Sequence, residues 1–503
     1  MTLQREPMAN VDCAWLRMDE PTNLMMITAV LTFSEPLTVE QIKQIVAERL
    51  LPLNRFRQRV GRPNTSLGSP YWETDPHLDL DEHIRRAELP PPSDQKALQE
   101  LVSRLMSIPL NPARPLWQYH VVEDYQGGSA LIARIHHSIG DGIELTKVLL
   151  SMTDTARETG LAPATRRPRR RGRKGRVNRV LHAARQVGDE IVHDTLVAVR
   201  DPRRAIDLAR LGTGGVLRLG QILFRMPDPQ TAFKGPLGIE KRAAWSRRLP
   251  LADVKAVGKV TGGTINDVLL TAVAGGLRSY LLQRGEPVDG LSFHAVVPVN
   301  LRSLDSPITL GNKFGLVFLE LPLGIADPVE RLEAVKRHMD ALKNSPEAPA
   351  IYGLLNVVGK GPVELESLLV TIFGTKATGV MTNVPGPRQQ LYIAGAPLRD
   401  VMFWVPQSGR LGLGVSIISY NGGVLVGVAT DAGLVPDPET IVAGFEHSFS
   451  EMMELVALLH ADGELPEPAH TSPVNRCQAF TRQGARCRNR AQAGSTFCRV
   501  HDG

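Results

Sequence analysis

The chain has 503 residues, of which 43% are apolar and 22% charged, and it carries a formal net charge of +6. This length exceeds one ordinary hydrophobic core, so we expect two lobes. No apolar stretch approaches the roughly 18 residues of a spanning helix, and the N-terminus, with Arg5, Glu6 and Asp12, lacks the apolar core of a signal peptide. We therefore expect a cytoplasmic protein, and its four cysteines exclude a disulfide-built scaffold.

The first 152 residues predict alternating strands and helices. Residues 25–33 are rich in apolar and β-favouring side chains, which indicates a strand. Thr38 then precedes a segment in which Ile42 and Ile45 recur at helical spacing, so we expect a helix capped by Thr38. This part of the chain should be a mixed α/β lobe.

Two adjacent histidines in residues 136–142, which read His-His-Ser-Ile-Gly-Asp-Gly, are the most informative feature of the chain. Residues 130–135 before them are strand-like, and residues 143–152 after them carry apolar side chains at helical spacing, which predicts a strand-to-helix turn. A neutral imidazole, with an unperturbed pKa of about 6.5, can accept a proton from a hydroxyl or an amine. The segment therefore indicates a general base.

Two other interpretations compete with catalysis. His137 and Asp141 would share one face of a helix and could bind a metal, but Gly140 and Gly142 favour a turn, and no other His or Cys cluster lies nearby in the sequence. The histidines could also be purely structural. Catalysis is preferred, because chance would place such a pattern in only about one in a thousand chains of average composition.

Residues 161–230 differ from the segments around them and are interpreted as a connector between two lobes. Residues 166–179 hold nine arginines and lysines and no acid, and since the net charge is only +6, the rest of the chain is slightly acidic. A helical pattern of apolar residues follows, up to a break at Asp201-Pro202. A basic tract before an amphipathic helix suits an anionic membrane surface or a lipid droplet. A solvated, disordered run and, least favoured, a nucleic-acid contact are the alternatives.

The α/β alternation resumes in the second half. We predict strands at 293–299, 316–321 and 424–428 and helices at 264–282 and 328–342. The expected organisation is an N-terminal lobe at 1–160, the connector at 161–230, a C-terminal lobe at 231–462, a proline-containing linker at 463–473 and a tail at 474–503.

The tail concentrates metal-ligand side chains in a segment with almost no apolar core. Cys477, Cys487, Cys498 and His501 would suit one tetrahedral zinc. A segment of about 30 residues usually needs a metal or disulfides to fold, and a reducing compartment disfavours disulfides. A structural or partner-binding zinc module is therefore expected, with a disordered tail carrying stray thiols as the alternative.

Motifs for several common enzyme classes are missing, including GxxxxGK[ST], a GxGxxG after a strand, HExxH and GxSxG. From about Met8 to about Leu458 the chain instead resembles the bacterial wax ester synthase/diacylglycerol acyltransferase family. That family is a branch of the HHxxxDG acyltransferases, which look like chloramphenicol acetyltransferase and peptide-synthetase condensation domains. The matching segments besides the histidines are Asp12-Cys13-Ala14-Trp15-Leu16, Pro21-Thr22-Asn23, Arg114-Pro115-Leu116-Trp117, Thr264-Ile265-Asn266-Asp267, Val297-Pro298-Val299-Asn300-Leu301-Arg302, Gly311-Asn312-Lys313-Phe314-Gly315 and Thr382-Asn383-Val384-Pro385-Gly386-Pro387.

The resemblance implies two chloramphenicol acetyltransferase-like α/β lobes with a tunnel between them. An acyl-CoA would enter one end, and diacylglycerol or a long-chain alcohol the other, with no further cofactor for catalysis. His137 would accept the hydroxyl proton while the oxygen attacks the thioester, and would then pass it to the CoA sulfur. The enzyme would attach peripherally to the inner face of the plasma membrane or to lipid bodies.

The resemblance also implies roles for the residues around this base. His136 is expected to support the site, because consecutive residues at a strand end point to opposite sides. Asp141 is expected to form a structural salt bridge to Arg302, with orientation of His137 as the alternative, and Asn266 is nominated for stabilising an oxyanion. Gly142 and Asp267 are expected to give structural support.

Two further classes of function remain open at this point. One is a condensation-type enzyme that acylates amines or carrier-bound substrates. The other is a non-catalytic protein that binds lipid or nucleic acid.

Overall fold

The computed structural model describes residues 5–62, 69–157, 226–300, 310–312, 314–343, 374–407 and 411–461. The chain divides into two units, Met1–Met452 and Met453–Gly503, and the sheets and the paired histidines lie in the first. The basic run at 166–179, Arg302 and the Cys/His tail lie outside the described residues, so the predictions made for them are not addressed by the structure. No helix among the described residues is long and apolar enough to span a membrane.

The first large sheet is built mainly from the N-terminal half and has six strands in the order β13-β14-β2-β7-β6-β5. Its central strands β2, β7 and β6 pair antiparallel, which confirms the strands predicted at 25–33 and 130–135. The strand bounds are β2 Met26–Phe33, β5 Ile84–Arg86, β6 Trp117–Tyr125, β7 Gly128–His136, β13 Tyr392–Ile393 and β14 Ala396–Trp404.

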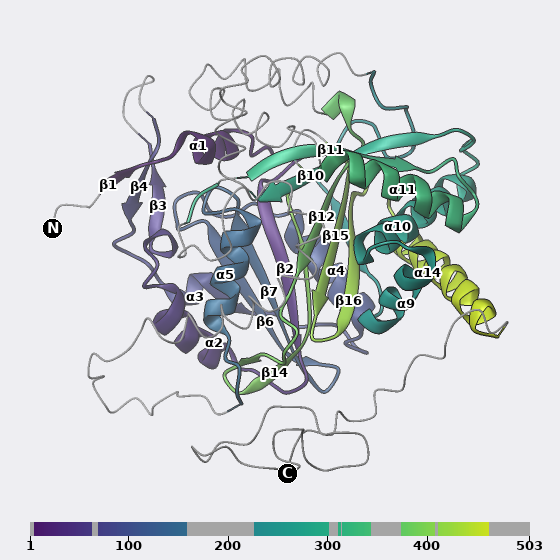
Figure 1. The fold of residues 1–503 in the computed structure, drawn as a ribbon. Coiled ribbons are helices and arrows are strands. Elements are labelled where there is room, and N and C mark those ends of the chain that lie inside the picture. The colour runs from purple at the N-terminus through teal and green to yellow at the C-terminus, as the bar shows by residue number, and fades with distance from the viewer. Residues whose placement is uncertain are drawn as a thin grey trace, which may run out of the picture. The chain divides into compact units, whose positions relative to one another are not determined.

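One strand of this sheet comes from the other half of the chain. β14 pairs antiparallel with β2, with Trp404 opposite Thr28 and Leu398 opposite Phe33 (Figure 1). The two sheets are therefore not divided at the connector, because the C-terminal half contributes β13 and β14 to the N-terminal sheet.

The second large sheet has seven strands, in the order β11-β10-β12-β15-β16-β8, with β9 also pairing with β16. β12 runs parallel to both β10 and β15, and the remaining pairs are antiparallel. The strands predicted at 293–299, 316–321 and 424–428 are confirmed as β10, β11 and β16. The bounds are β8 Lys241–Trp245, β9 Leu249–Pro250, β10 Ser292–Asn300, β11 Phe314–Pro322, β12 Gly379–Pro385, β15 Leu413–Tyr420 and β16 Gly423–Asp431.

Several helices begin at a side-chain cap that the sequence supplies. Thr38 and Gln41 form a reciprocal capping box at the start of α2, which confirms the predicted cap. The helices predicted at 264–282 and 328–342 are α10 and α11. The bounds are α1 Asn10–Arg17, α2 Val39–Ile45, α3 Leu80–His83, α4 Gln95–Met106, α5 Gly142–Met152, α9 Leu251–Thr261, α10 Ile265–Gln283, α11 Pro328–Lys343 and α14 Pro438–Ala461. A small third sheet is formed by β1 Arg5–Pro7, β3 Gln58–Gly61 and β4 Tyr71–Thr74.

Helix α4 covers the edge strand β8 of the second sheet. Ser103 Oγ accepts from the Ala243 N–H at 2.9 Å, and Ser107 Oγ accepts from the Lys241 N–H at 2.9 Å. Gln95 Nε2 donates to the Trp245 carbonyl at 2.9 Å. Helix side chains thus satisfy backbone groups that an open sheet edge would leave unpaired, and they join the two halves of the chain.

Candidate active site

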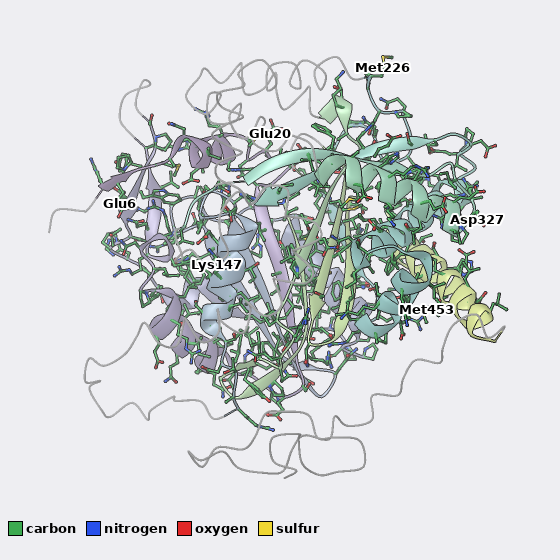
Figure 2. The ribbon with its side chains drawn as sticks, in the orientation of Figure 1. Glu6, Glu20, Lys147, Met226, Asp327 and Met453 are labelled. Carbon is green, nitrogen blue, oxygen red and sulfur yellow. The ribbon has the colours of Figure 1, made fainter. Side chains whose placement is uncertain are left out.

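The paired histidines lie where β7 passes into α5, at the strand-to-helix turn that the sequence predicted. β7 ends at His136 and α5 begins at Gly142. Asp141 is the N-cap of α5, where its Oδ1 accepts from the Glu144 N–H at 3.0 Å, and its side chain is buried. A buried ion pair follows one turn on, since Lys147 Nζ, labelled in Figure 2, donates to Glu144 Oε1 at 2.8 Å. The cap and the ion pair fix the first turns of α5 behind the histidines.

The His137 side chain is enclosed and neutral. Its ring stacks on Trp15 of α1 with centroids 4.1 Å apart and planes inclined by 21°. Burial lowers its pKa to about 3, although an interaction with its own backbone and a hydrogen bond with Asn312 oppose the shift. A buried, deprotonated imidazole has a lone pair ready to accept a proton.

The His136 ring has different neighbours, as expected of consecutive residues at a strand end. Its Nδ1 accepts from the Ser138 N–H at 3.1 Å. Nε2 lies 3.6 Å from Asp19 Oδ1, and the same oxygen accepts from the Met25 N–H at 2.6 Å. His136 is therefore part of a polar cluster that ties the ends of β7 and β2 together.

Two residues to which the sequence assigned no role anchor the His137 backbone. Asn312 Nδ2 donates to the His137 carbonyl at 2.9 Å and to Asp12 Oδ1 at 2.8 Å. Asp12 lies on α1, one turn before Trp15, and Asn312 lies shortly before β11. Both belong to segments quoted for the family resemblance, but nothing in the local sequence shows that they meet, because 300 positions separate them.

The start of α10 brings together two further segments of that resemblance. Thr264 is the N-cap and forms a capping box with Asp267, whose Oδ2 accepts from the Thr264 N–H at 2.8 Å. Asn266 Oδ1 accepts from Asn383 Nδ2, so the Asn-Asp segment contacts the Thr-Asn-Val-Pro-Gly-Pro segment on β12. Asp267 thus takes part in the cap of α10, and both the structural support expected of it and the oxyanion role of Asn266 remain predictions.

An apolar pocket runs along α5. Its walls come from β2 and β7 on one side, from α5 and from the β12, β14 and β15 region of the C-terminal half. Gly142, the first residue of α5 after the histidine turn, is among the lining residues. Representative side chains are Ile27, Ile135, Leu145, Val148, Phe403 and Ile418. The described part of the chain contains no group of three or more His, Cys, Asp or Glu side chains able to hold a metal ion.

Comparisons with known proteins show the family to which the chain is similar. The family model described as the wax ester synthase/diacylglycerol acyltransferase catalytic domain matches residues 8–269, and that of the corresponding C-terminal domain matches residues 310–453. A putative diacylglycerol O-acyltransferase of Mycobacterium tuberculosis is 31% identical over 427 residues, which covers 82% of this chain and 88% of the relative. A probable diacylglycerol O-acyltransferase of the same organism is 29% identical over 420 residues, covering 82% and 87%.

The fold has a counterpart of known structure. The wax ester synthase/diacylglycerol acyltransferase from Marinobacter aquaeolei superposes with a TM-score of 0.65 at 24% identity, over 90% of this chain and 100% of that one. The expected two-lobed, chloramphenicol acetyltransferase-like α/β fold is thereby confirmed.

Proposed function

Because this chain belongs to the wax ester synthase/diacylglycerol acyltransferase family, we propose that it transfers a long-chain acyl group from acyl-CoA to the hydroxyl of diacylglycerol or of a long-chain alcohol. The observation that carries the proposal is the neutral, buried His137 at the β7–α5 turn. The apolar pocket along α5, which Gly142 helps to line, supports it, because a long acyl chain is bound by apolar walls.

His137 supplies proton transfer in both halves of the proposed reaction. Its imidazole accepts the hydroxyl proton as the alcohol oxygen bonds to the thioester carbonyl carbon. When the carbon–sulfur bond breaks, the imidazolium returns that proton to the departing CoA sulfur. The products are an ester and free CoA, and no acyl-enzyme is required.

Substitution of each histidine tests this assignment. His137→Ala should lower acyl transfer by about 10²–10⁴-fold or abolish it, since that is the usual contribution of general-base assistance. His136→Ala should retain measurable activity. The assay offers labelled palmitoyl-CoA with diacylglycerol, hexadecanol or a long-chain amine and separates the products. The opposite order of activities would assign the base to His136, and faster acylation of the amine would favour a condensation-type enzyme.

We also propose that the enzyme works at an anionic membrane or lipid-droplet surface. The support is the block of nine basic residues at 166–179 in a chain that is otherwise slightly acidic. Lipid substrates dissolve in membranes, so an enzyme that uses them must reach that surface.

We propose one structural zinc in the C-terminal tail, held by Cys477, Cys487, Cys498 and His501. Three thiolates and one imidazole fill a tetrahedral shell, which leaves no position for water and hence no role in acyl transfer. Metal analysis of the reduced full-length protein should give about one zinc per chain, and Cys487→Ser should lower that figure. Zinc content near zero in the wild type would rule the site out.

A further inference from the structure

Asn312 is oriented unambiguously in the active site. Its Nδ2 lies within hydrogen-bond distance of two acceptors, the Asp12 carboxylate at 2.8 Å and the His137 carbonyl at 2.9 Å. If the amide were rotated by 180°, its oxygen would face both acceptors and could donate to neither. Only the observed orientation therefore makes these two hydrogen bonds. Asn312 is 8% exposed and Asp12 2% exposed, which removes competition from water.

The His137 carbonyl, which accepts the second hydrogen bond, lies outside regular secondary structure. β7 has ended at His136 and α5 has not begun, so the His137 peptide groups are held by individual contacts. The His137 N–H donates to the Met25 carbonyl at 2.8 Å, from the segment before β2. The His137 carbonyl accepts from Asn312, which comes from the C-terminal half. The two halves of the chain thus hold the histidine backbone from its two sides.

Helix α1 contributes two contacts to this arrangement from one of its faces. Asp12 and Trp15 are three positions apart, so their side chains project from the same side of the helix. Trp15 stacks on the His137 ring, and Asp12 holds the amide that binds the His137 carbonyl. A carboxylate acceptor makes a stronger hydrogen bond than a neutral one and fixes the amide more firmly.

We propose that Asn312, held in place by Asp12, is a positioning residue that sets the geometry of His137 for proton transfer. This inference rests on the acyl transfer proposed above, but it assigns a role that the histidine motif does not contain. Proton transfer requires the base within hydrogen-bond reach of the hydroxyl, and a displacement of about 1 Å can cost on the order of 100-fold in rate.

Asn312→Ala is the direct test. It removes the donor to the His137 carbonyl, and we expect kcat to fall about 100-fold, while KM for palmitoyl-CoA changes little because the acyl pocket is intact. Asp12→Asn retains an oxygen acceptor without the charge, so its kcat should fall less. Asp228→Asn is the matched control: Asp228 is also buried, at 4% exposure, and binds His294 and Thr378 in the C-terminal half. It should leave kcat unchanged.

Exchanging the charged and the neutral side chain between positions 12 and 312 distinguishes a positioning role from an effect on overall stability. Asn312→Asp places a second carboxylate next to that of Asp12, so it should lower both the stability of the fold and kcat. Adding Asp12→Asn restores a donor–acceptor pair between positions 12 and 312 and should recover stability, but the His137 carbonyl still faces an oxygen, so kcat should stay low. Recovery of kcat together with stability, or an Asn312→Ala enzyme within about twofold of wild-type kcat, would overturn the proposal.

A spectroscopic measurement keeps this test independent of the proposed activity. With histidines labelled at the ring nitrogens, the His137 signal is identified by its loss in His137→Gln. At neutral pH, Asn312→Ala should shift that signal and Asp228→Asn should not. An unchanged His137 signal in Asn312→Ala would refute positioning. If Asn312→Ala shifts the His137 signal but the wild-type protein acylates no acceptor, the proposed function alone is refuted.

Discussion

Burial, rather than a charged neighbour, determines the charge state of His137. Desolvation is the largest cause of its lowered pKa, and the ring stacks on Trp15 instead of pairing with a carboxylate. The same desolvation that keeps the base free of protons weakens it as an acceptor. The side chain of Asn312 acts in the opposite direction and raises the pKa of His137 in part.

The pH dependence of the reaction follows from this charge state. With a pKa of about 3 in the free enzyme, His137 is already deprotonated throughout the neutral and mildly acidic range. We expect kcat/KM to remain level from about pH 8 down to about pH 5, without an ionisation near the ordinary histidine value. Initial rates with labelled palmitoyl-CoA in constant-ionic-strength buffers measure it. An acid limb with an apparent pKa of about 6.5 would contradict the enclosed base.

The stability of the fold should decrease in acid. The unfolded chain protonates its histidines near pH 6.5, whereas folded His137 and His120 have pKa values of about 3 and about 4. Because the unfolded state then binds more protons, stability is complete above about pH 6.5 and declines as the pH falls toward these values. His120→Gln serves as a control, since it should flatten the acid decline in stability without changing the activity profile.

The sequence indicated a candidate base but could not indicate the residues that hold it. Two histidines, an aspartate and a glycine at fixed spacing indicate a base through local chemistry alone. Asp12 and Asn312 could not be paired in this way, since their contact spans 300 positions and depends on how α1 and the segment before β11 are packed. Arg302 lies outside the described residues, so its predicted salt bridge to Asp141 stays a prediction.

At the scale of elements, the β7–α5 turn depends on its cap. Asp141→Ala should destabilise the protein by about 1 kcal/mol or somewhat more, because it removes the side chain that accepts from the Glu144 N–H. Asp94→Ala, at the N-cap of α4, removes an equivalent bond to the Ala97 N–H and serves as the control. Denaturant unfolding followed by circular dichroism measures both. A fully stable but inactive Asp141→Ala protein would show that Asp141 instead orients His137.

Periodicity predicted the elements but could not predict every partner. The strands at 25–33 and 130–135 and the helix at 264–282 were evident because alternation and helical spacing are local properties. β14 has an ordinary strand pattern, yet it pairs with β2 from the other half of the chain. Pairing between strands so far apart in the sequence depends on the complete sheet. The predicted lobe boundary near residue 231 therefore marks a change in the sequence pattern but does not separate the two sheets.

At the scale of the whole chain, the two halves complete each other around the candidate site. β14 extends the N-terminal sheet, and α4 covers the edge of β8 with serine and glutamine side chains. Asn312 then reaches the His137 carbonyl from the C-terminal half. Because the turn that carries His137 contacts both halves of the chain, the geometry of this histidine depends on the folding of both halves together.

The attachment to an anionic surface proposed above is also tested at this scale, because that proposal rests on the charge of the basic run and not on the folded core. Replacing the nine basic residues of 166–179 with glutamine keeps the length of the connector but removes the positive block. Each Lys or Arg near an anionic surface contributes about 1 kcal/mol, so recovery of the protein with phosphatidylserine vesicles should fall sharply. Activity on detergent-dispersed diacylglycerol should be nearly unchanged, because the substitution leaves His137 and the α5 pocket in place.

Vesicles of neutral phosphatidylcholine provide the control for this experiment, since they should bind the wild type and the variant equally weakly. Raising the salt concentration should release the wild type from the anionic vesicles by screening, and it should have little effect on the variant. Equal recovery of the two proteins on phosphatidylserine vesicles would show that the basic run does not bind the membrane. The enzyme would then have to reach its substrate through apolar contacts.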